Sequence, residues 1–226
     1  MRGNTMIKRV LWTASISAAV AVASGPALAH HPLGGMPMKT FAHGVLSGVG
    51  HPILGFDHLF FVALVGIAAI YTGYRLTAPL AYIGAMLAGC LLMSFGIQLP
   101  IVEIVVGLSL VALGAVVMSG RALGATAAMV GFAVAGLFHG SAFGSSIVGQ
   151  EGGAPTVVLL GYLIGLAITQ YAIALAAGWA AVAIWNAREA AAVPARLAGA
   201  VVAGVGLFMS LEKAEGLIFP ALGFAS

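Results

Sequence analysis

Residues 51–58 read His-Pro-Ile-Leu-Gly-Phe-Asp-His, and this stretch decides how the rest of the chain is interpreted. It places two imidazoles and a carboxylate inside a hydrophobic segment that runs from about residue 41 to residue 71. Ionisable side chains within a membrane segment are costly and mark functional sites. Proline and glycine break the helix here, and a break at membrane depth is tolerated only where protein or a water-filled cavity covers the freed backbone groups. The stretch therefore predicts a broken membrane helix beside a polar pocket.

The composition places the whole chain in a membrane. Of its 226 residues, 62% are hydrophobic and 7% are charged, whereas soluble domains carry about 25% charged residues. We therefore expect an all-α polytopic membrane protein. The single cysteine, Cys90, excludes an intramolecular disulfide framework and a Cys-rich metal site. No basic run points to nucleic acid, and no phosphate-binding glycine loop points to nucleotide hydrolysis.

The first 29 residues have the pattern of a secretory signal peptide. Three basic residues precede a short apolar run over 10–23, and Ala27-Leu28-Ala29 forms a small-x-small cleavage site. An uncleaved first helix is the alternative. Cleavage predicts a mature N-terminus at His30 and His31 and one transmembrane domain over 30–226.

Hydropathy and length then predict six transmembrane spans in the mature chain. Their expected ranges are 41–72, 77–98, 101–118, 122–147, 156–185 and 196–222. Abundant glycine and alanine predict close helix packing.

The arginines of the connections predict the orientation. Arg75, Arg121, Arg188 and Arg196 fall in alternate connections, and the connections between those carry no Lys or Arg. By the positive-inside rule the arginines face the cytoplasm. We therefore expect an inner-membrane protein whose mature N-terminus and C-terminus both lie outside the cytoplasm.

A short pattern suggests an internal repeat. Both 43–48 and 139–144 read His-Gly-x-x-x-Gly, within the first and fourth expected spans. This spacing fits three helices followed by three inverted helices. His43 and His139 would then line the same pocket.

The side chains at the break have the chemistry of a metal site. His51 and His58 are seven residues apart, nearly two helical turns, and so share a face as far as the break allows. Asp57 is able to coordinate directly or to orient an imidazole, and His139 has to come from another helix. Imidazole and carboxylate without thiolate suit Ni, Co, Zn or Cu(II). An interhelical hydrogen bond is the alternative role for a lone membrane histidine.

Further candidates lie outside the motif. His30 and His31, with the new α-amine, form a potential capture site for nickel or copper, with a solvated tail as the alternative. Glu151 is placed to attract cations at the external mouth, or is a solvated loop charge. Glu212 and Glu215 share a helical face and predict a relay, a second cation site or an interhelical ion pair with Lys213.

The motif at 51–58, followed by an apolar run, resembles the HupE/UreJ family of nickel/cobalt permeases, small bacterial membrane proteins associated with hydrogenase and urease. The resemblance extends over most of the mature chain. It implies that His51, Asp57, His58 and His139 bind the metal. Members of the family often carry a second motif H-G-x-A-H-G. Residues 139–144 here read His-Gly-Ser-Ala-Phe-Gly, so Phe143 stands where a second histidine would be.

The resemblance implies an inner-membrane permease, not an enzyme, whose cargo is Ni²⁺ or Co²⁺ and which holds no resident cofactor. Its partners would be the metal ion and the lipid bilayer, and a homo-oligomer is compatible with the sequence. One alternative is an intramembrane zinc hydrolase, in which three histidines hold Zn²⁺ and Ser141 or Ser145 assists. Another is a metal-handling accessory protein that does not transport.

Overall fold

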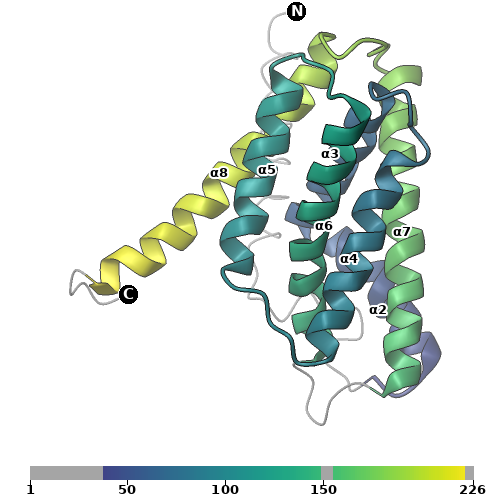
Figure 1. Cartoon of the computed structure of the whole chain (residues 1–226), viewed down its shortest axis with the longest axis vertical. Coiled ribbons are helices and arrows are strands. Elements are labelled where there is room, and N and C mark those ends of the chain that lie inside the picture. The colour runs from purple at the N-terminus through teal and green to yellow at the C-terminus, as the bar shows by residue number, and fades with distance from the viewer. Residues whose placement is uncertain (1–37, 149–154, 222–226) are drawn as a thin grey trace, which may run out of the picture.

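The computed structural model describes residues 38–148 and 155–221, and every regular element in that part of the chain is a helix (Figure 1). The predicted signal peptide, His30, His31 and Glu151 lie outside the described residues. The all-α prediction is confirmed. The helices are α2 (Phe41–Leu54), α3 (Phe56–Ile70), α4 (Ala78–Ser94), α5 (Val102–Met118), α6 (Ala125–Val148), α7 (Thr156–Ala183) and α8 (Val193–Ala221).

The predicted break lies at Gly55. Helix α2 ends at Leu54, α3 begins at Phe56, and the two helices are bent by 81°. Gly55 is extended, with φ −83° and ψ 96°, and its N–H still donates to the His51 carbonyl at 2.9 Å. His51 and His58 therefore lie on different helices, so the expectation that they share one helical face is wrong.

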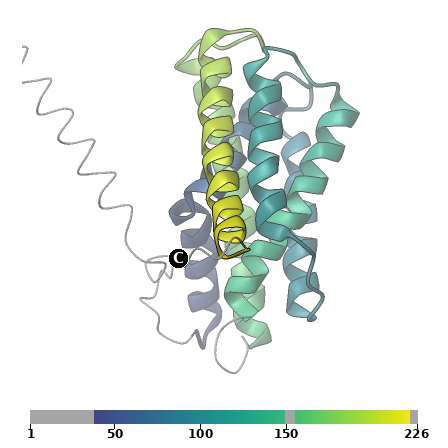
Figure 2. The same cartoon turned by 90° about the vertical axis from the view of Figure 1, so that its left-hand side faces the viewer.

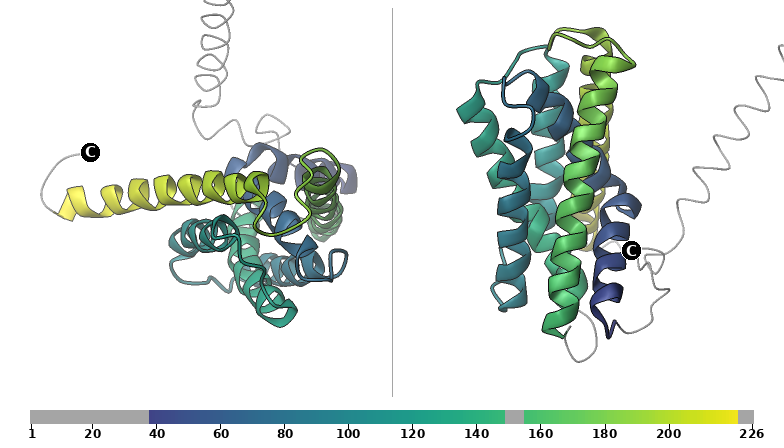
Figure 3. Two further views of the ribbon diagram at one scale, coloured as in Figure 1. Left: turned by 90° about the horizontal axis from the view of Figure 1, so that it is seen from above. Right: turned by 90° about the vertical axis from the view of Figure 1, so that its right-hand side faces the viewer.

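Glycines set the closest helix contacts. A Cβ on Gly140 of α6 would overlap the Met86 carbonyl of α4, and a Cβ on Gly66 of α3 would overlap the Ala174 carbonyl of α7. A Cβ on Gly114 of α5 would likewise overlap the backbone of α8. The predicted packing through small residues is confirmed at these contacts. Helix α8 packs along α5 as far as the ion pair of Lys213 with Glu103, and its C-terminal end extends away from the other helices (Figures 1 and 3).

Three of the described helices are long and apolar enough to cross a membrane, namely α6, α7 and the 193–216 part of α8. Counting the bent pair α2–α3 as one span gives four. Helices α4 and α5 have 17 residues each, shorter than their predicted ranges. At 1.5 Å per residue such a helix is about 26 Å long, against roughly 30 Å for the hydrocarbon core. The count of six spans and the inverted repeat remain predictions.

The four arginines predicted for the connections gather at one end of the molecule, with Arg196 in the first turn of α8. The α3–α4, α5–α6 and α7–α8 connections all lie there (Figures 1 and 2). Tyr71 Oη donates to the Ala187 carbonyl at 2.9 Å, and Arg196 Nε donates to the Met118 carbonyl at 2.9 Å, which ties these connections together. We refer to this as the arginine end. Its cytoplasmic location remains a prediction.

Candidate metal site

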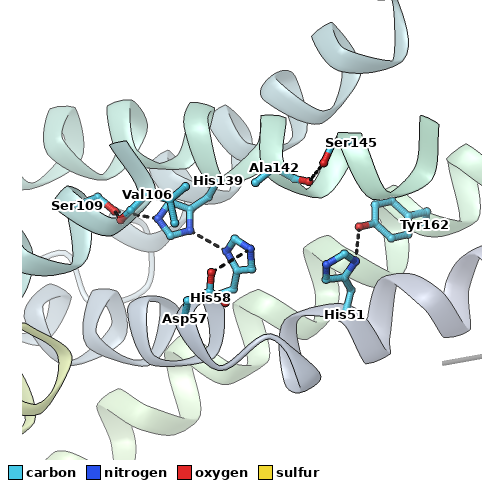
Figure 4. A network of polar contacts seen from close by, with 9 residues as sticks. All are labelled: His51, Asp57, His58, Val106, Ser109, His139, Ala142, Ser145 and Tyr162. Carbon is cyan, nitrogen blue, oxygen red and sulfur yellow. Dashed lines mark hydrogen bonds and ion pairs between the residues drawn. The ribbon is translucent and has the colours of Figure 1, made fainter. Parts of the chain in front are cut away.

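The break between α2 and α3 faces the middle of α6 (Figure 4). His51 lies in the last turn of α2 and His58 in the first turn of α3. His139 comes from α6. His58 is 7% exposed and His139 is fully buried. The break thus brings the start of α3 against a histidine that is 81 residues away in the chain.

A chain of polar contacts joins the two buried histidines to α5. His58 Nδ1 lies 2.9 Å from His139 Nδ1, and His139 Nε2 lies 2.9 Å from Ser109 Oγ (Figure 4). Ser109 Oγ donates in turn to the Val106 carbonyl at 2.7 Å. Both ring nitrogens of His139 are therefore engaged, and its ring is held in place from two sides.

The acceptor at the end of this chain determines where the protons lie. The Val106 carbonyl only accepts, so the single Ser109 proton points toward it. His139 then donates from Nε2 to Ser109 and accepts at Nδ1. Neutral His58 has to donate from Nδ1, and its Nε2 is left with a lone pair.

That lone pair faces a carboxylate. Asp57 Oδ2 lies 3.6 Å from His58 Nε2, and the two side chains are 25% and 8% exposed. Two acceptors repel each other unless a proton or a metal cation lies between them. Two ligands held about 2.1 Å from a tetrahedral ion are separated by about 3.4 Å. His58 Nε2 and Asp57 Oδ2 thus have nearly the spacing of two ligands of one metal ion.

His51 stands on the other side of the break. Its Nδ1 lies 3.1 Å from Tyr162 Oη of α7, and Tyr162 also donates to the Phe143 carbonyl at 3.3 Å. The ring of Phe143 packs against both His51 and His58, with centroids 5.0 Å and 4.1 Å away. The His51 and His58 ring centroids are 6.3 Å apart. Phe143 therefore fills the space between the two motif histidines.

These groups converge without forming a closed cage. Across residues 38–148 and 155–221, no three His, Cys, Asp or Glu side chains are positioned to hold one metal ion. The two Nδ1 atoms are also joined by a hydrogen bond at 2.9 Å, and neither is available to an ion while that bond persists. Binding by all three histidines would require their side chains to move.

The remaining candidates lie apart from this cluster. His43 is in the first turn of α2, where its Nδ1 accepts from the Lys39 N–H at 3.3 Å. Eight residues of helix place it about 12 Å along the axis from His51. Glu212 and Glu215 are exposed on α8. Lys213 pairs with Glu103 of α5 at 2.7 Å, which is an interhelical ion pair, as one alternative anticipated, but with Glu103 as the carboxylate.

The serines proposed for a hydrolase do not contact the histidines in the described contacts. Ser145 is exposed and donates to the Ala142 carbonyl of its own helix at 2.6 Å. Ser141 is buried, at 3% exposure. The serine that contacts His139 is Ser109, which the sequence reading did not select.

Sequence reasoning missed both hydroxyl partners, Ser109 and Tyr162. Each lies in an apolar helix other than the one that carries its histidine, and nothing in the local sequence distinguishes it from a packing residue. Neither contact could be predicted from the sequence, because the two partners are far apart in the chain. Ser109 is 30 residues from His139, and Tyr162 is 111 residues from His51.

Comparison with known proteins agrees with the motif. The family described as "HupE / UreJ protein" matches residues 18–209. The relative named "Protein HupE" from Rhizobium leguminosarum bv. viciae is 31% identical over 195 residues, covering 84% of this chain and 94% of its own length. No solved structure matches the chain. The chain is therefore a member of the HupE/UreJ family.

Proposed function

We propose that this protein is a secondary permease of the bacterial inner membrane for a divalent transition metal, nickel first and cobalt second, serving metalloenzyme maturation. The observation that carries the proposal is the facing pair of His58 Nε2 and Asp57 Oδ2, 3.6 Å apart at a helix break. This pair offers a nitrogen lone pair and a carboxylate to an ion, which is the donor chemistry that nickel and cobalt accept. Family membership supports the same proposal.

The remaining histidines complete the site as the ion arrives. His139 is the nearest, through the Nδ1 contact at 2.9 Å. Its Nδ1 becomes available when the His58 ring turns away and the hydrogen bond between the two rings opens. His51 approaches from α2 on the opposite side of the break. A site that is assembled only when occupied suits transport, because conduction requires release as well as binding.

The metal is cargo, and the chain supplies its transient ligands. We propose that it travels from the end of the molecule opposite the arginine end toward the arginine end. His30, His31 and Glu151, which lie outside the described residues, are proposed to raise the local concentration of cations on the outer side. Because a ligand nitrogen has to be unprotonated, we expect binding to weaken in acid.

Uptake of radioactive nickel tests the proposal in cells that lack other nickel importers. Wild type is compared with His58→Ala and Asp57→Asn at matched membrane abundance, and both variants are expected to lose most uptake. His43→Ala makes the same substitution on α2 about 12 Å from His51, and it is expected to retain uptake. Equal loss in all three variants would contradict the placement of the site.

Measurements on the wild-type protein distinguish between the three proposed functions. Absence of both nickel and cobalt uptake by wild type would overturn the permease proposal for these ions. Nickel bound by the purified protein without uptake would favour the non-transporting accessory role. Zinc-dependent hydrolysis of a membrane peptide would favour the hydrolase.

A further inference from the structure

A second polar site lies at the arginine end, away from the histidines. A cavity of about 600 Å³ lies between α3 and α7 and the connections that follow them. Its volume falls in the range of small-molecule pockets, roughly 300–1,000 Å³. Its polar end is formed by Arg75, Asn186 and Arg188, and its apolar wall includes Ile70, Leu175 and Val182.

The polar end carries positive charge that the described protein does not neutralise. Arg75 is exposed and makes no hydrogen bond or ion pair within the described residues. Arg188 Nε donates to Asn186 Oδ1 at 2.9 Å, which leaves its terminal amines for another acceptor. Glu189 follows Arg188 in sequence but does not line the cavity, and the described ion pairs do not include it.

The apolar wall continues from the arginines along α3 and α7. Gly66 of α3 and Gly178 of α7 lie at the closest approach of the two helices and form the floor of the cavity. Trp179 lines it and is 66% exposed. Tryptophan is enriched where the hydrocarbon meets the headgroups. The cavity thus combines a cationic end with an apolar surface that a tryptophan flanks.

We propose that this cavity holds an anionic phospholipid of the leaflet at the arginine end, with its phosphate between Arg75 and Arg188 and an acyl chain along α3 and α7. Arginine guanidinium groups suit phosphate because their planar donors match two of its oxygens. Basic pockets between membrane helices bind anionic headgroups in this way. The charge complementarity and the apolar wall together select a lipid over a soluble anion.

Native mass spectrometry of the purified full-length protein tests the proposal. The detergent-solubilised protein is mixed with phosphatidylglycerol or with phosphatidylcholine of the same acyl chains, and the retained adducts are counted. We expect phosphatidylglycerol adducts to exceed phosphatidylcholine adducts severalfold. Arg75→Gln combined with Arg188→Gln is expected to reduce the phosphatidylglycerol adducts about tenfold.

A matched variant separates this site from general positive charge. Arg121→Gln makes the same charge change as either single variant, Arg75→Gln or Arg188→Gln, and lies at the same end of the molecule but outside the cavity. It is expected to keep the adducts, whereas each single variant is expected to lose them severalfold. Equal loss in Arg121→Gln, or equal adducts with both lipids, would overturn the proposal. Displacement of the lipid by excess glycerol phosphate would assign the site to a soluble anion and would also overturn it.

The measurement counts lipid adducts and involves neither metal binding nor metal uptake. Loss of nickel transport therefore leaves the lipid result unaffected, and absence of lipid adducts leaves the permease proposal unaffected. Size-exclusion chromatography of each variant confirms that a change in adducts comes from the site and not from unfolding.

Discussion

The ring of Phe143 packs on the imidazole of His58, with their centroids 4.1 Å apart. Residues 139 and 143 are one helical turn apart on α6, so they share a face. A histidine at position 143 would therefore point toward the same ion as His139 and His58. With phenylalanine at this position, the site has one imidazole fewer, while the aromatic packing on His58 is kept.

Phe143→His is expected to bind nickel more tightly than wild type, by about tenfold or more, because it adds a further imidazole. Transport is expected to slow, since a tighter site releases its ion more slowly. Calorimetric titration of the purified protein measures the nickel affinity, and nickel uptake by cells measures the transport rate. Phe143→Leu changes the packing without adding a ligand and serves as the control. Unchanged affinity in Phe143→His would place residue 143 outside the metal's reach.

Ser109→Ala is expected to weaken nickel binding by about tenfold, because groups that orient a metal-binding histidine typically contribute that much. The serine fixes which His139 nitrogen carries the proton, through its 2.9 Å contact. Ser109→Thr keeps the hydroxyl and is expected to bind close to wild type. Equal weakening in both variants would point to packing, and normal binding in Ser109→Ala would remove Ser109 from the site.

Gly140→Ala is expected to lower stability by more than 1 kcal/mol, roughly the cost of an overpacked contact. The added methyl overlaps the Met86 backbone carbonyl, which no side-chain rotation relieves. Gly131→Ala, on the same helix, has no heavy atom within 4 Å of the new Cβ. It is expected to be neutral or stabilising by about 0.5–1 kcal/mol, from helix propensity. Thermal unfolding in detergent compares the two, and similar unfolding temperatures would contradict the packing.

Glu212 and Lys213 are expected to change the nickel concentration for half-maximal uptake in opposite directions. Both line a cavity of about 580 Å³ with Glu103, between α5 and α8. Glu212→Gln removes a negative charge that attracts cations and should raise that concentration, while Lys213→Gln should lower it. The effects should shrink at high salt because exposed charges are screened. A rise in both variants, insensitive to salt, would indicate a structural effect instead.

Much of the fold was predictable because membrane helices are encoded locally. The helical ranges of 156–185 and 101–118 differ from the structure by two residues at most. The break was predictable from the glycine of the motif, but its 81° angle was not. The angle is set by the packing of both α2 and α3 against α7. That angle is also why His51 and His58 do not share a helical face.

The site was predictable as a set of ligand types but not as a geometry. The motif identified His51, Asp57 and His58 because placing ionisable side chains in a membrane costs free energy. Contacts such as those of Ser109 with His139 and of Tyr162 with His51 depend on how helices pair. The sequence of one helix carries no information about which neighbour it meets, so those contacts required the structure.

The break at Gly55 also brings two opposite helix termini together within the protein. The carbonyls of the last turn of α2 give that terminus a partial negative charge, and the amides of the first turn of α3 give the other a partial positive charge. Asp57 lies in the first turn of α3 and offsets its positive end. The negative end of α2, beside His51, is left to favour a cation. The backbone itself thus attracts a positive ion to the break, with an electrostatic contribution that remains when any one ligand side chain is removed.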